Sequence, residues 1–435
     1  MNPVKKFLTT SKNIEKSGAI WNMIASLIFS FQQVILSMVM THVLAEDIGQ
    51  VMAGIFAIGY ADANLFLCVG KYGVRFFQVS DIEKEYKFKE YRIARIITTI
   101  GMVVISAIYV IIVANANNYS LNKALVVFWV CMLKVPDAFE DIYFGEYQKN
   151  NRLDVASKMW ATRYIITIVV MIILIVTTQN LLLTVIASTI ISFGVMGIYI
   201  YWTKEFVSEN IPAKMKSVWK HLLVTLPLAL GAVLVSYIGV APRSAIDAYI
   251  QDDKIQAIYT YLAMPVFVVQ MMMTFIFNPC AYKISCLWDA RKMDDYIKES
   301  LKQALFLVVI TVVCFIGAAI LGVPVLSLIF NVDLKPYKVD LLIMMVGSGF
   351  LGLATLLGNL LTVMRYQNAI LWGYVIVAIL SFIFCGKVVK VYGIRGAVIF
   401  YVAILLLLCL IFIGEFIYGV FINKKNKNIY NAEGV

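Results

Sequence analysis

Residues 304–330 read ALFLVVITVVCFIGAAILGVPVLSLIF, and no charged side chain interrupts them. A helix needs about 20 mainly apolar residues to cross the hydrocarbon core of a bilayer. This stretch is long enough to do so, and it therefore predicts a membrane-spanning helix.

The composition of the whole chain has the same character. Hydrophobic residues make up 61% of the 435 residues, against roughly 45–50% in soluble domains. Charged residues make up 14%, against about 25% in soluble domains. So few charges cannot cover a water-soluble surface, which excludes a soluble enzyme, a disordered scaffold and a secreted disulfide module. Because the apolar runs are long and continuous, we expect helices rather than a barrel.

Apolar runs recur along the chain and predict an all-α polytopic membrane protein with twelve transmembrane helices. A tight turn at Thr178-Gln179-Asn180 separates the fifth run from the sixth. The expected spans are 18–43, 51–70, 93–114, 123–147, 158–178, 181–202, 221–241, 257–279, 304–330, 339–364, 368–386 and 396–422.

The lysines and arginines indicate the orientation, because cytoplasmic loops carry an excess of both. The net charge is +11, and most basic residues fall in the two tails and in loops on one side, such as 71–92. The opposite side carries Lys123, Arg243, Lys254, Lys335, Lys338, Lys387, Lys390 and Arg395. We therefore expect both termini in the cytoplasm, and this topology accounts for the basic charge without nucleic-acid binding.

Twelve spans divide into two sets of six, as in transporters that arose by duplication. Residues 46–50 (EDIGQ) precede the second span and residues 252–256 (DDKIQ) precede the eighth, so a similar pattern recurs six spans apart. The predicted architecture is therefore two pseudo-symmetric six-helix bundles. Its parts are a cytoplasmic N-tail at 1–17, an N-terminal lobe at 18–202, a cytoplasmic linker at 203–220, a C-terminal lobe at 221–422 and a cytoplasmic C-tail at 423–435.

Side chains that commonly bind metals or perform catalysis are few. The seven cysteines are scattered without a C-x-x-C spacing, and the only histidines are His42 and His221. We expect neither a disulfide framework, a metal site nor enzymatic activity. The sequence Gly347-Ser348-Gly349-Phe350-Leu351-Gly352 matches a dinucleotide-binding pattern, but it lies inside an apolar span. It is typical of close helix packing instead.

The fourth span contains charged residues that a membrane interior disfavours. A charge at mid-membrane costs about 2.5–3.5 kcal/mol on insertion scales, so such residues usually face protein or water. Helical spacing places Lys134, Asp137 and Asp141 on one face. Two interpretations remain open: a lysine–aspartate pair that only neutralises itself, or the wall of a cavity that attracts an anion or takes part in ion coupling.

Charged residues in other spans could likewise have either a structural role or a role in a cavity. Asp62 lies within the second span, and Arg163 lies near the cytoplasmic end of the fifth. Arg75 and Arg163 could extend toward the lipid headgroups rather than act in the interior. Arg243 follows the seventh span and would pair with Asp247 if that stretch is helical.

Several stretches together carry a family pattern. They are 42–50 (HVLAEDIGQ), 70–75 (GKYGVR), Gln148, Arg152 and Leu153 with Arg163 beyond, 241–249 (APRSAIDAY), 277–279 (FNP) and 392–397 (YGIRGA). Across nearly the whole chain, this pattern resembles polysaccharide flippases of the MOP (multidrug/oligosaccharidyl-lipid/polysaccharide) exporter superfamily. The similarity is greatest to Wzx-type transporters of capsule, O-antigen or teichoic-type repeat units.

The resemblance implies a MATE-like fold and a function. That function is translocation of undecaprenyl-pyrophosphate-linked oligosaccharide from the inner to the outer leaflet of a bacterial cytoplasmic membrane, by alternating access. It also implies a central cationic cavity and coupling to an H⁺ or Na⁺ gradient, with no other cofactor. The expected partners are the lipid-linked oligosaccharide, the bilayer and the polysaccharide polymerase machinery, with no nucleic acid.

For that cargo, the cations expected to bind the pyrophosphate are Lys134, Arg75, Arg163 and Arg243. The carboxylates expected to serve in ion coupling or to contact sugar hydroxyls are Asp62, Asp137 and Asp141.

Two other functions compete with this one. A multidrug or other small-molecule exporter of the same fold would export mainly cationic drugs, for which an acidic cavity is expected. A polytopic polysaccharide polymerase would need a sizeable catalytic loop, and the longest loops here, at about 20–25 residues, are too short for a separate domain.

Overall fold

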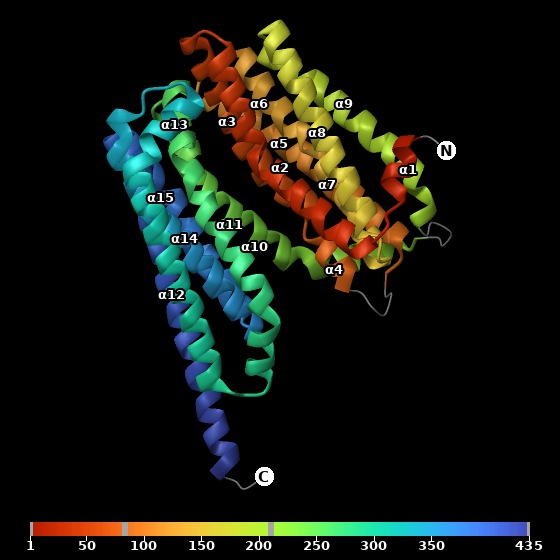
Figure 1. Ribbon diagram of the computed structural model, residues 1–435, viewed down its shortest axis with the longest axis vertical. Coiled ribbons are helices and arrows are strands. Elements are labelled where there is room, and N and C mark those ends of the chain that lie inside the picture. The colour runs from red at the N-terminus through yellow and green to blue at the C-terminus, as the bar shows by residue number, and fades with distance from the viewer. Residues whose placement is uncertain (1–2, 81–85, 208–212, 433–435) are drawn as a thin grey trace. The chain divides into compact units, whose positions relative to one another are not determined.

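The computed structural model describes residues 3–80, 86–207 and 213–432 (Figure 1). Parts of the predicted N-tail, of the 71–92 loop with Lys84, of the 203–220 linker and of the C-tail lie outside the described residues. The side chains of 277–279 also lie outside the description.

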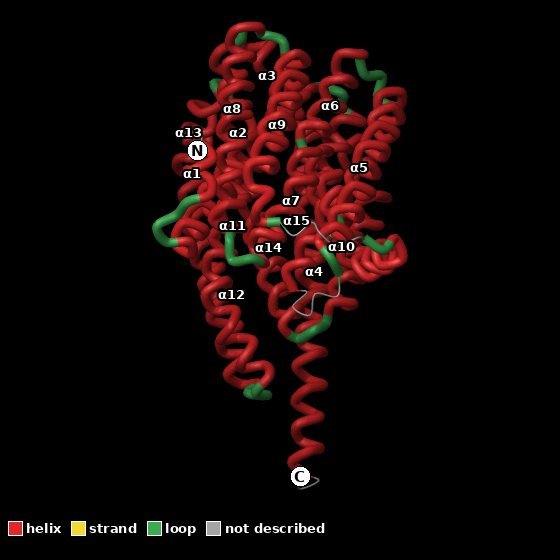
Figure 2. Tube along the Cα trace, turned by 90° about the vertical axis from the view of Figure 1, so that its right-hand side faces the viewer, coloured by secondary structure: helices red, strands yellow, loops and turns green. Residues whose placement is uncertain are grey.

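Helices joined by short turns make up the described chain (Figure 2). Their bounds are α1 Pro3–Thr9, α2 Ile14–Val43, α3 Glu46–Lys71, α4 Val74–Ser80, α5 Phe88–Ala116, α6 Leu121–Leu133, α7 Val135–Lys149, α8 Leu153–Thr178, α9 Leu181–Thr203, η1 Lys204–Phe206, α10 Met215–Tyr249, α11 Asp253–Asp289, α12 Met293–Gly317, η2 Ala318–Gly322, α13 Val323–Phe330, η3 Lys335–Tyr337, α14 Lys338–Val363 and α15 Gln367–Ala432.

Within the described ranges, nine helical stretches are long and apolar enough to cross a membrane, and the protein is a multi-pass membrane protein. The stretches are Ile14–Val43, Asp47–Lys71, Phe88–Ala116, Leu153–Thr178, Leu181–Phe206, Met215–Tyr249, Met293–Phe330, Lys335–Val363 and Gln367–Ile422. Their outer faces fit a lipid environment. Ile100, Val104, Ile108 and Ile111 recur every three or four residues along α5 and are exposed, which would be unfavourable in water.

The remaining expected spans have visible counterparts. The last apolar stretch covers two of them, because α15 is interrupted at Gly393 by a non-helical backbone (φ 60°, ψ −142°). The expected span 123–147 is formed by α6 and α7, each shorter than a membrane crossing. The expected span 257–279 lies within α11. The count of twelve crossings and the cytoplasmic position of the termini stay predictions.

The chain divides into two compact units, Met1–Val240 and Ala241–Val435. The division falls inside α10 rather than in the 203–220 segment, so α10 contributes to both units. The lobe boundaries predicted from the sequence stay a prediction.

In the first unit, α7 occupies the interior although it carries four acidic residues. It contacts α3, α4, α5, α8 and α9, and nearly all of its side chains are buried. Around it, α2 packs against both α3 and α8 (Figure 1). The predicted hairpin between α8 and α9 is confirmed, with Gln179 in the left-handed conformation and Asn180 capping α9. The acidic side chains on α7 are consequently enclosed by protein.

In the second unit, α14 packs against α11, α12 and α15. A Cβ atom added at Gly347 would lie 2.9 Å from Val402, and one added at Gly349 would lie 2.7 Å from Thr311. Only glycine allows the neighbouring helices to come this close. The interpretation of this glycine-rich stretch as a helix-packing surface is therefore confirmed.

Candidate functional site

The break between α6 and α7 places Lys134 in the interior of the first unit. Pro136 has no backbone N–H, so the helical hydrogen-bond ladder cannot pass through it unbroken. The chain ends α6 at Leu133 and starts α7 at Val135. Lys134 occupies the junction between them, with only 1% of its surface exposed.

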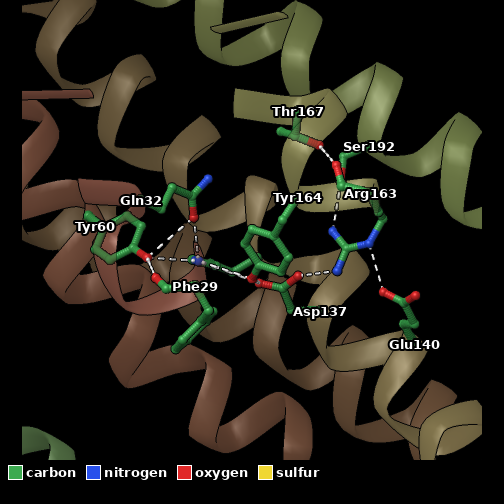
Figure 3. A network of polar contacts seen from close by, with 10 residues as sticks. Phe29, Gln32, Tyr60, Asp137, Glu140, Arg163, Tyr164, Thr167 and Ser192 are labelled. Carbon is green, nitrogen blue, oxygen red and sulfur yellow. Dashed lines mark hydrogen bonds and ion pairs between the residues drawn. The ribbon is translucent and has the colours of Figure 1, made fainter. Parts of the chain in front are cut away.

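Oxygen atoms surround the ammonium group of Lys134. They belong to Gln32, Tyr60, Tyr164 and Asp137, whose side chains are labelled in Figure 3. Its Nζ donates to Gln32 Oε1 at 3.0 Å, to the Tyr60 hydroxyl at 3.1 Å and to the Tyr164 hydroxyl at 3.4 Å. Asp137 Oδ2 lies 3.5 Å away and supplies the negative charge. Lys134 and Asp137 thus form an ion pair, which is one of the two interpretations that the sequence left open.

Asp137 is shared between Lys134 and Arg163. Arg163 Nη2 donates to Asp137 Oδ1 at 2.5 Å, and the Tyr164 hydroxyl donates to Asp137 Oδ2. Arg163 also donates from Nε to Glu140 Oε2 at 2.7 Å and from Nη1 to Ser192 Oγ at 2.9 Å. The network contains two carboxylates, Asp137 and Glu140, and two cations, Lys134 and Arg163, so its charges balance. All four side chains are buried.

The position of Arg163 corrects one interpretation made from the sequence. An arginine near the end of a span can extend to the headgroups, but Arg163 is only 2% exposed and points inward from α8. The physical reason is that Asp137 and Glu140, one helical turn apart on α7, offer it two carboxylates.

A second network joins the ends of α3, α4, α5 and α7. Arg95 Nη2 donates to Asp141 Oδ2 at 2.8 Å, and its Nη1 donates to the Gly70 carbonyl at 2.6 Å. Arg75 Nη1 lies 3.6 Å from Asp141 Oδ1 and its Nη2 donates to Gln148 Oε1 at 2.9 Å. Asp141 therefore pairs with Arg75 and Arg95 rather than with Lys134.

The turn between α3 and α4 positions Arg75 within this network. Tyr72 and Gly73 both adopt positive φ angles, which reverses the chain after Lys71. The Arg75 guanidinium lies 3.8 Å from the centre of the Phe144 ring, a cation–π contact. Its side chain keeps 30% of its surface exposed, in contrast to the buried Arg95.

The other predicted site residues are Asp62 in the first unit and Arg243 in the second. Asp62 is buried on α3 and accepts a hydrogen bond from the Tyr109 hydroxyl at 3.3 Å. Arg243 and Asp247 are both buried on the part of α10 that belongs to the second unit. The structure therefore brings together Lys134, Asp137 and Arg163 in one network, and Arg75 and Asp141 in another.

Some participants were not singled out from the sequence. Arg95 is fully buried and holds Asp141, yet it resembles one more basic residue at the start of a span. Its position inside the expected span 93–114 could have identified it as a charged residue within the membrane. Tyr60, Tyr164 and Ser192 gave no signal, because tyrosine and serine are common in membrane helices and only the packing brings them to charged groups.

Comparisons with known proteins place this fold. No protein-family model matches the chain. No curated protein matches it either. Solved structures do match, and they include transporters of the MOP superfamily.

A structure described as lipid II flippase MurJ, in an inward closed conformation, has a TM-score of 0.69 and 14% identity, over 94% of this chain and 91% of that chain. An inward-facing multidrug resistance MATE transporter of the MOP superfamily has a TM-score of 0.61 and 13% identity, over 93% of this chain and 99% of that chain. A MOP transporter from Pyrococcus furiosus, whose description reports a binding pocket of reverse polarity, has a TM-score of 0.56 and 12% identity, over 98% and 99% of the two chains. The chain therefore shares its fold with these solved structures.

Proposed function

We propose that the protein is a flippase for a lipid-linked oligosaccharide. Its cargo would be a repeat unit on undecaprenyl pyrophosphate, moved by alternating access across a bacterial cytoplasmic membrane for capsule- or O-antigen-type polysaccharide synthesis. A polysaccharide polymerase would then consume the translocated units. Unaided transfer of the head group through hydrocarbon is prohibitive, because the pyrophosphate charges would lose their hydration.

The observation that carries this proposal is the state of the charges in the first unit. Asp137, Glu140 and Asp141 are each bonded to an arginine, so a cationic drug would have to displace that arginine to reach them. Arg75 also pairs with Asp141, but its side chain is partly exposed and is oriented by Phe144. This arrangement favours an anionic head group over a cationic drug, in a fold that the lipid II flippase also has.

The roles of individual residues are part of the proposal. Arg75 is the first candidate for the pyrophosphate, and Arg243 is the candidate in the second unit. Lys134 and Arg163 would bind phosphate only by exchanging a carboxylate partner for it. Coupling to an H⁺ or Na⁺ gradient, or sugar contacts, would fall to Asp62, Asp137 and Asp141.

Reconstituted protein can test the flippase function directly. Proteoliposomes would carry a lipid-linked oligosaccharide in both leaflets, and an impermeant hydrolase would cleave only the molecules in the outer leaflet. With the protein present, cleavage should proceed beyond the outer-leaflet half. Arg75→Gln should slow this second phase by tenfold or more, whereas Lys16→Gln, an exposed lysine outside both networks, should not. A second phase no faster than in protein-free liposomes would refute the proposal.

Multidrug export is the second candidate, and the similarity to the multidrug MATE transporter favours it. The same proteoliposomes distinguish the two functions. A multidrug exporter should move ethidium or a related cationic dye against its gradient when an H⁺ or Na⁺ gradient is imposed. Dye movement without oligosaccharide movement would establish this alternative.

A further inference from the structure

The surroundings of the Lys134 ammonium group form a complete shell for a cation. We call this shell the ammonium cage, and it consists of Phe29, Gln32, Tyr60, Asp137 and Tyr164. The ring centres of Tyr60, Phe29 and Tyr164 lie 4.4, 4.5 and 5.3 Å from Nζ (Figure 3). Aromatic faces combined with oxygen acceptors are the chemistry by which proteins bind ammonium ions.

The hydrogen-bond directions in the cage are consistent with a bound ammonium. The Tyr164 hydroxyl donates its proton to Asp137, and the Tyr60 hydroxyl donates to the Phe29 carbonyl at 3.2 Å or to Gln32 at 3.3 Å. Both hydroxyl oxygens therefore present lone pairs to Nζ. The three ammonium protons have three acceptors, and a carboxylate lies next to them.

We infer that the cage is a monovalent-cation site whose occupant is built into the chain as Lys134. Asp137 then has a permanent, tethered counter-ion and does not take up a free coupling cation. Removing the tether should convert the cage into a binding site for a free primary alkylammonium ion. Without Lys134, the carboxylates Asp137 and Glu140 face only Arg163 in this network, so an excess negative charge would attract a cation.

This inference rests on the cage alone and not on the proposed cargo. It removes Lys134 from the residues proposed to bind pyrophosphate and Asp137 from those proposed to bind a coupling ion, because each serves as the counter-ion of the other. Ion coupling, if it uses the first unit, would then involve Asp62 or Asp141.

The test measures ligand binding to the purified full-length protein in lipid nanodiscs by thermal unfolding. Lys134→Ala removes three methylenes and the ammonium, so n-propylammonium matches the missing atoms. The midpoint of Lys134→Ala should rise saturably with n-propylammonium and not with n-propanol, which has the same shape without the charge. Wild type, whose cage is full, and Lys134→Met, whose cage is filled by a neutral side chain, should show no such rise.

Two outcomes of the n-propylammonium measurement would contradict the inference. Stabilisation of wild type and Lys134→Ala to the same extent, or of neither, would overturn it. If Lys134→Ala does not fold, expression with n-propylammonium should recover folded protein, and failure of that recovery would also count against the cage.

A second measurement compares wild type with Asp137→Asn. Any difference between the unfolding midpoints in NaCl and in choline chloride at the same ionic strength should be the same in both proteins. A Na⁺-specific stabilisation that disappears in Asp137→Asn would show a free-cation site at Asp137 and refute the inference. Neither measurement involves oligosaccharide, so their outcome is independent of the flippase assay.

Discussion

Arg163→Met should strongly destabilise the first unit, because it leaves Glu140 buried without its arginine. Arg163 donates to Glu140 at 2.7 Å and to Asp137 at 2.5 Å, and all three side chains are at most about 5% exposed. Removing one partner of a buried ion pair costs about 3–5 kcal/mol, since the remaining charge loses its compensation. Asp137 keeps Lys134 and the Tyr164 hydroxyl, so most of the loss falls on Glu140.

A double-mutant cycle isolates that contribution. Glu140→Gln alone leaves Arg163 bonded to Asp137 and Ser192, so we expect a smaller cost of about 1–3 kcal/mol. In the double variant the stranded carboxylate is gone. Its cost should therefore be smaller than the sum of the two single costs by about 1 kcal/mol or more.

The assay is thermal unfolding of the purified protein in nanodiscs, followed by intrinsic fluorescence. A loss of 3–5 kcal/mol corresponds to a fall in the midpoint on the order of 10 °C for a domain of this size. Lys16→Met, at an exposed lysine, serves as the control and should leave the midpoint unchanged. Strictly additive costs in the cycle, or a midpoint unchanged in Arg163→Met, would refute the account of a coupled buried network.

Two further predictions concern the turn before Arg75 and the topology. Gly73→Ala should lower the free energy of unfolding by about 1–2 kcal/mol, because Gly73 has φ +66°. Gly101→Ala, on a helix with open space around it, should not destabilise the protein. Equal effects of the two substitutions would contradict the argument from backbone conformation. In a variant whose seven native cysteines are replaced, Leu121→Cys should react with an impermeant thiol reagent added outside intact cells. Lys16→Cys should react only after the cells are opened, and the reverse pattern would overturn the predicted orientation.

The sequence predicted much of the charged interior, because charge in a membrane is costly enough to stand out. A lysine–aspartate pair was one of the two interpretations left open for Lys134, and the structure contains the pair Lys134–Asp137. Asp141 was expected on the same face, yet it pairs with Arg95 and Arg75. Periodicity places residues on a face of one helix, but the partner helix decides which of them meet.

Other parts of the site depended on packing over long sequence distances. Gln32 lies 102 residues from Lys134 along the chain and supplies its shortest hydrogen bond. The sequence also allowed Arg163 to extend to the lipid headgroups, but the structure places it between Asp137 and Glu140. A sequence states that such groups exist within apolar segments, but not which helices enclose them.

What the sequence alone determined is that this chain lies in a membrane as a bundle of helices, because continuous apolar stretches leave no other stable arrangement in lipid. It also indicated that α7 must be shielded, since a helix with Asp137, Glu140 and Asp141 cannot face hydrocarbon. Only the tertiary structure decided how the shielding is achieved. Neutralising a buried charge requires a partner within about 4 Å. That proximity comes from the packing of α3, α5 and α8 around α7 and of α2 against α3 and α8.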